Sequence, residues 1–259
     1  MHTNQSPKHC HICGRRLRGR AWAYAPNGDP DEQAIVVCHQ CHQEAPRCDV
    51  CGLPMGENHI RLPDGRRTCP RCHQTAIYDP AQAQALFERV ARVVTDQLGL
   101  GLNVGTDFGL VDHQHLQRLA EEASSPLHDD ADKADQNPKA DQNPKADQNP
   151  VIGLFVRKGR RRTMALLSGL PQVLLIQTLA HEWAHAWQGE NCPLLQDPFI
   201  REGFAEWVAY KTLQAMGAVK KMALMERQDG LYGQALQKML ALERRVGASG
   251  VIDSCRRAE

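Results

Sequence analysis

The sequence has few aromatic residues, no long apolar run and no excess of charge of either sign. Its 259 residues include 31 Lys+Arg and 30 Asp+Glu, so a net charge of +1 argues against a general nucleic-acid coat. No apolar stretch approaches the ~20 residues of a membrane span, and residues 1–20 lack the apolar segment of a secretory signal. These absences predict a soluble, cytoplasmic protein that does not use a membrane as a partner.

Cysteine, in contrast, is abundant and regularly spaced. Eight of the ten cysteines form four Cys-x-x-Cys pairs, which are Cys10/Cys13, Cys38/Cys41, Cys48/Cys51 and Cys69/Cys72. Such a pair places two thiolates on one side of a tight turn, at the spacing that tetrahedral zinc requires. Sequential pairing predicts two structural four-cysteine zinc sites, the first with Cys10, Cys13, Cys38 and Cys41, the second with Cys48, Cys51, Cys69 and Cys72. Nearby histidines are the alternative ligands.

These two sites define a predicted double zinc-finger module over residues 8–78. The segment has few large apolar side chains, so its folding depends on zinc, which supplies roughly 10–16 kcal/mol of apparent binding free energy per structural site. Its slight positive charge favours a protein-docking or regulatory role over nucleic-acid binding.

The middle of the chain alternates between helical patterns and a repeat. Apolar spacing predicts helices over about 81–98 and 112–122, within a helical segment spanning 79–130. The hexapeptide Lys-Ala-Asp-Gln-Asn-Pro then occurs three times, and a repeat without large apolar side chains cannot build a core, so residues 131–150 are predicted to be a linker. Residues 151–156 and 164–167 predict a β-hairpin at the start of a third segment, 151–259.

The strongest chemical signal lies in the helix predicted to begin near Pro171. His181 and His185 are four residues apart, so both imidazoles lie on one helical face and can share a metal ion. Glu182 is rotated about 100° from His181, which suits a catalytic base that does not ligate the metal. The His-Glu-x-x-His pattern by itself is moderately specific.

A third ligand is expected downstream, and it must be an acid because no histidine follows His185. A helix predicted from Phe199 to about residue 216 carries Glu202 and Glu206 one turn apart. We expect Glu202 to be the third ligand and Glu206 to orient a histidine ligand. Gly203, between them, is expected to let this helix approach the His-Glu-x-x-His helix closely.

Two histidines and a glutamate leave a coordination position for water, which is typical of a catalytic zinc rather than a structural one. The residues therefore predict a zinc peptidase that acts on a protein or peptide substrate, with Glu182 as general base. Tyr210 and Tyr232 are the candidate oxyanion donors. The alternative is a zinc-finger adaptor or nucleic-acid-binding protein whose peptidase-like domain is inactive. The peptidase hypothesis predicts three zinc ions per chain, one catalytic and two structural. The adaptor hypothesis requires only the two structural ions.

The motif His181-Glu-Trp-Ala-His-Ala-Trp187 with Arg201-Glu-Gly-Phe-Ala205 resembles the gluzincin peptidases. More widely, the chain resembles the ubiquitin-activated zinc peptidases with LIM domains that restrict organ growth in plants. The resemblance implies an intracellular endopeptidase in which His181, His185 and Glu202 bind zinc and Glu182 is the base. It also implies an α+β architecture, in which a LIM-like double finger precedes a helix-rich, gluzincin-like domain with a small β-sheet.

Overall fold

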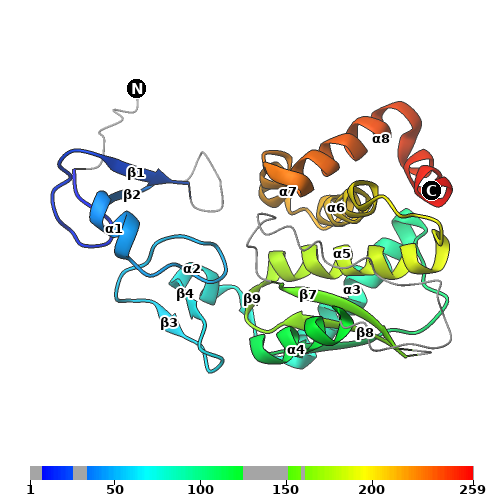
Figure 1. Cartoon of the computed structure of the whole chain (residues 1–259), viewed down its shortest axis with the longest axis horizontal. Helices are drawn as coiled ribbons and strands as arrows, with labels where there is room; N and C mark the ends of the chain where they lie inside the picture. The colour runs from blue at the N-terminus through cyan, green and yellow to red at the C-terminus, as the bar shows by residue number, and fades with distance from the viewer. Residues whose placement is uncertain (1–7, 26–33, 125–150, 159–160, 259) are drawn as a thin grey trace. The chain divides into compact units, whose positions relative to one another are not determined.

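The computed structural model describes residues 8–25, 34–124, 151–158 and 161–258, and within these the chain forms two compact units, Met1–Ala76 and Ile77–Glu259 (Figure 1). The predicted linker at 131–150 lies outside the described residues. Among the described helices, none is both long enough and apolar enough to cross a lipid bilayer.

The first unit consists of short elements around two cysteine clusters. They are β1 (Ala21–Tyr24), β2 (Ile35–Cys38), α1 (His39–Glu44), β3 (Ile60–Arg61), β4 (Arg67–Thr68) and α2 (Pro70–Gln74), followed by β5 (Ala76–Ile77) at the junction. β1 pairs antiparallel with β2, and β3 pairs antiparallel with β4. Each short helix begins directly after a cysteine, Cys38 or Cys69, so the backbone turns where a thiolate is presented.

The second unit is larger and mostly helical. Its helices are α3 (Pro80–Leu98), α4 (His113–Ser124), α5 (Gln172–Asn191), α6 (Pro198–Ala215), α7 (Val219–Glu226) and α8 (Gly230–Arg257), and its strands are β6 (Asp107–Val111), β7 (Gly153–Lys158), β8 (Arg161–Leu167) and β9 (Leu170–Pro171). The helices predicted at 81–98 and 112–122 are present within a residue or two of the predicted ends.

The sheet of this unit has the strand order β6-β8-β7. β7 pairs antiparallel with β8, which confirms the predicted hairpin, while β6 pairs parallel with β8. Helix α5 packs on β7 and β8, and α6 packs between α5 and α8, so the metal-ligand helix lies between the sheet and a helical layer (Figure 1).

The core of the second unit fills the space between these layers. Trp187 of α5 stacks on Phe204 of α6 with ring centroids 5.4 Å apart, and Trp207 is also fully buried. Asp197 caps α6 by accepting hydrogen bonds from the backbone of Phe199 and Ile200. This large apolar core fixes where α5 and α6 meet, and with it the positions of the predicted ligands.

The expected role of Gly203 in the approach of α6 to α5 needs correction. A Cβ atom at Gly203 would lie 3.0 Å from the backbone oxygen of Ala235, which belongs to α8. Gly203 therefore permits the close packing of α6 against α8, on the side away from the expected partner.

Candidate metal centre

Helix α5 places the two predicted histidine ligands one turn apart. The Nε2 atoms of His181 and His185 are 3.0 Å apart, and the two rings meet edge to face. Both side chains are only partly exposed because α6 and α8 cover this part of α5. The i, i+4 spacing thus aims two ring nitrogens at one point.

Helix α6 brings Glu202 to the same point. Its Oε2 atom lies 3.3 Å from Nε2 of His181 and 3.5 Å from Nε2 of His185. These three residues form one of three groups of potential metal ligands among the described residues. The structure therefore assembles the predicted set of two imidazoles and one carboxylate from two helices.

The outer hydrogen bonds of the two rings decide what faces the centre. His181 donates from Nδ1 to Oε1 of Glu206 at 2.9 Å, and His185 donates from Nδ1 to Oε1 of Gln188 at 2.9 Å. With each ring proton on Nδ1, both Nε2 atoms present lone pairs toward each other and toward a carboxylate. Such a cluster of electron pairs suits a cation, and Nε2 and carboxylate donors suit zinc.

The titration of the two groups follows from their proximity. Burial lowers the pKa of His181, but hydrogen bonds to Glu202 and Glu206 outweigh it, so the pKa lies well above its ordinary value. Burial raises the pKa of Glu202, yet the neighbouring His185 and His181 bring it well below its usual range. A positive charge on His181 and a negative charge on Glu202 are thus favoured. A bound cation would place positive charge at the same point.

Glu182 directly follows His181 on α5 and is buried. It faces β7, where a Cβ atom built on Gly153 would lie 3.2 Å from Oε1 of Glu182 and 2.4 Å from Cγ2 of Thr178. The absence of a side chain at Gly153 therefore leaves room for the Glu182 carboxylate at the edge strand of the sheet.

The two candidate tyrosines lie in different surroundings. The ring of Tyr232, near the start of α8, lies 6.3 Å from the ring of His181. The hydroxyl of Tyr210 donates a hydrogen bond to Glu226, and burial together with this carboxylate raises the pKa of Tyr210 to about 12. Of the two, Tyr232 is adjacent to the metal centre.

Gln188 was not anticipated as a functional residue. Besides accepting from His185, it donates from Nε2 to the backbone oxygen of Arg201 at 3.0 Å, which fixes the orientation of its amide. The signal was available in the sequence, because Gln188 lies three residues after His185 and so on the same helical face.

The first unit contains the other two groups of potential ligands, and both consist of four cysteines. They are Cys10, Cys13, Cys38 and Cys41, and Cys48, Cys51, Cys69 and Cys72, with all four sulfurs of each group within 4.8 Å of one another. Both groups match the predicted sequential pairing and are consistent with structural zinc sites. Among the histidines near these pairs, His42 stacks on Trp22 with ring centroids 4.2 Å apart.

Backbone amides stabilise the thiolates in these clusters. Cys10 accepts a hydrogen bond from the backbone N–H of Cys38 at 3.4 Å, and Cys48 accepts one from Cys69 at 3.3 Å. Burial raises the pKa of Cys10, but its backbone hydrogen bonds exceed this effect and lower the pKa to about 6. A thiolate at neutral pH is the form that binds metal.

Comparison with known proteins gives two distant relatives. Over 191 residues, which are 67% of this chain, the sequence is 25% identical to Protein DA1 of Arabidopsis thaliana. Over 189 residues, also 67% of this chain, it is 25% identical to LIM domain-containing protein HDR3 of Oryza sativa subsp. japonica. The matches span 35% and 38% of those proteins, so the chain corresponds to about a third of their length.

No family model matches the chain, and no solved structure matches it. The two relatives and the four-cysteine clusters support a relationship to LIM-containing proteins of the DA1 type.

Proposed function

We propose that the protein is a zinc-dependent metallopeptidase of the gluzincin type, whose four-cysteine module docks or regulates a protein partner. The observation that carries the proposal is the convergence of His181, His185 and Glu202, with Glu182 beside them on the same helix as the histidines. The substrate would be a protein or peptide. The four-cysteine module would bind two structural zinc ions and the α5–α6 centre a third.

Each residue of the centre has a defined task in this proposal. His181, His185 and Glu202 would hold the zinc, and zinc supplies a Lewis acid that polarises a carbonyl and acidifies water. Glu182 would accept a proton from the attacking water and deliver it to the leaving amine. Glu206 and Gln188 keep each imidazole in the tautomer that directs Nε2 inward. Tyr232, rather than Tyr210, would donate to the developing oxyanion because it adjoins His181.

The direct test is the substitution Glu182→Gln. We expect it to lower the rate of cleavage of reduced, alkylated casein by about 10²- to 10⁴-fold while the zinc content of the full chain is unchanged. Glu121→Gln, the same chemical change at an exposed position of α4, is the matched control and should cleave at the wild-type rate. Metal analysis should give three zinc ions per wild-type chain. Two zinc ions and no cleavage would instead favour the adaptor function, and undiminished cleavage by Glu182→Gln would remove Glu182 as the base.

A further inference from the structure

Two cysteines outside the three ligand clusters lie in contact in the second unit. Cys192 is the residue directly after α5 and Cys255 belongs to the last turns of α8, and their sulfur atoms are 3.5 Å apart. Both side chains are buried, at 6% and 2% exposure. Residues 63 positions apart in the chain have thus been brought together by the packing of α8 against α5.

This pair is connected to the candidate metal centre through one side chain. The amide nitrogen of Gln188 lies 3.7 Å from the sulfur of Cys255, while its amide oxygen accepts from His185. Gln188 is buried, at 4% exposure. A change at Cys255 therefore acts on the residue that orients a predicted metal ligand.

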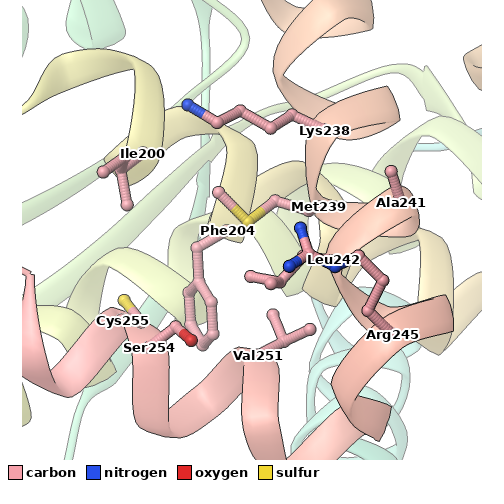
Figure 2. A pocket seen from close by; sticks show the side chains of 10 residues that line it. All are labelled: Ile200, Phe204, Lys238, Met239, Ala241, Leu242, Arg245, Val251, Ser254 and Cys255. Carbon is pink, nitrogen blue, oxygen red and sulfur yellow. The ribbon is translucent and has the colours of Figure 1, made fainter.

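A cavity of about 240 Å³ between α6 and α8 reaches one member of the pair, Cys255. Figure 2 shows side chains that line it, among them Phe204, Val251 and Cys255, with those of Lys238 and Arg245 projecting from α8. Lys238 and Arg245 are exposed, whereas Phe204 and Cys255 are buried. The cavity is large enough for a small oxidant to reach Cys255, whose sulfur contacts that of Cys192.

The electrostatics of the pair favour one thiolate and one thiol. The hydrogen bond with Cys255, together with the charge of Arg256, lowers the pKa of Cys192 more than burial raises it. The same interaction, together with burial, raises the pKa of Cys255. The pair therefore holds one nucleophilic thiolate and one resolving thiol at contact distance.

We propose that Cys192 and Cys255 form a reversible disulfide on oxidation by hydrogen peroxide, and that this disulfide weakens metal binding at His185. The thiolate of the pair attacks one peroxide oxygen, the O–O bond breaks, and the products are a sulfenic acid and hydroxide. The sulfur of the remaining thiol then attacks the sulfenic sulfur and displaces the hydroxyl group, which leaves as water with the proton of that thiol. Two electrons pass from the two sulfurs to peroxide.

Formation of the bond requires the sulfurs to close from 3.5 Å to ~2.05 Å. Gly247, at φ 74°, interrupts the helical geometry of α8, so the segment after it can shift without unwinding the rest of the helix. The bonded Cys255 sulfur is a poorer acceptor, and Gln188 loses a contact that holds its amide in place. The effect on metal binding rests on the proposed function; formation of the disulfide does not.

The test uses the full, zinc-loaded chain treated with a small excess of hydrogen peroxide, then alkylated, digested and analysed by mass spectrometry. We expect a Cys192–Cys255 cross-linked peptide that dithiothreitol removes, and a melting temperature of the second unit higher by about 5 °C because the 63-residue loop is closed. Cys192→Ser should abolish the cross-link. The control Cys255→Ser combined with Ser254→Cys keeps the number of thiols but moves one to the neighbouring position, and should not cross-link either.

Absence of the cross-linked peptide in the wild-type chain, with both cysteines alkylated or overoxidised, would overturn the proposal. Zinc affinity at the third site, measured by competition with a chromogenic chelator, should fall up to about 10-fold on oxidation and recover with dithiothreitol. Unchanged affinity in the cross-linked chain would overturn the link to His185. A cross-link in a chain that binds only two zinc ions would show that the proposed peptidase function fails while the disulfide stands.

Discussion

The two units of this protein place their groups of potential metal ligands differently relative to the buried core. In the first unit, Cys48, Cys69 and Cys72 themselves belong to the small buried cluster, with Met55 as its one other buried member. In the second, a continuous core that includes Leu179, Trp187 and Trp207 is complete without the ligands, which lie at its partly exposed margin. The comparison teaches that groups of potential metal ligands can make up the buried core of one unit and lie at the edge of an independent apolar core in another.

Removal of metal should have the largest effect and a different one in each unit. We expect a strong chelator to unfold residues 8–76, because each structural zinc contributes roughly 10–16 kcal/mol of apparent binding free energy. The helical circular dichroism, which comes mainly from α3 to α8, should persist. Limited proteolysis with mass spectrometry locates the loss. Equal protease resistance of both units after chelation would break the comparison.

Loss of core volume should destabilise only the second unit. Leu179, fully buried in α5, precedes His181 by two residues, and Leu179→Ala should lower the free energy of unfolding by about 3 kcal/mol. Denaturant titration followed by helical circular dichroism measures this change. The zinc content of the four-cysteine sites should stay at two per chain. Val173→Ala, at an exposed position of the same helix, is the matched control and should cost less than about 1 kcal/mol.

The hydrogen bond from His181 to Glu206 should matter for metal affinity more than for folding. Glu206→Gln retains the size of the side chain but removes the charge that holds the Nδ1 proton, so we expect 10- to 100-fold weaker zinc binding at the third site. Isothermal titration calorimetry, after a mild chelator has emptied the third site, measures this affinity. An affinity equal to that of the wild-type chain would show that Glu206 has no part in orienting the ligand.

The last prediction concerns Gly153, where the effect is local to Glu182 and β7. A methyl group there would meet Thr178 at 2.4 Å and the Glu182 carboxylate at 3.2 Å, so Gly153→Ala should cost about 1–3 kcal/mol of stability through overpacking. It should also displace Glu182 and lower any peptidase rate, while zinc content remains unchanged. Gly109→Ala is the matched control, because a Cβ atom at this strand position has no heavy atom within 4 Å. It separates the displacement of Glu182 from the general effect of replacing a strand glycine.

Much of the local structure was available from the sequence. The Asp79-Pro80 cap, the apolar spacing of Leu86, Val90 and Val94, and the terminal Gly99 define α3 almost to the residue. The four Cys-x-x-Cys pairs likewise indicated how the sulfurs group, since each turn is set by its own few residues. Positions separated by one helical turn, such as His181 and His185, were predictable for the same reason.

Contacts between distant segments were harder to predict. The prediction that Gly203 brings α6 close to α5 was wrong, since its neighbour is Ala235 of α8. A glycine in a helix indicates that another helix can approach closely, but not which one. Likewise, nothing in the spacing of Cys192 and Cys255 indicates that their sulfurs touch.

The sequence by itself determined α3, α4 and the β7–β8 hairpin, the tight turn of each Cys-x-x-Cys pair and the face of α5 that carries two imidazoles. These properties depend on backbone dihedral preferences and on residues within one or two turns of each other. Only the tertiary structure decided that Glu202 reaches both imidazoles, that Gly153 leaves room for Glu182 and that Cys255 lies against Cys192. Those contacts depend on how a large apolar core sets the distances between helices and strands, and core packing responds to the shape of many side chains at once.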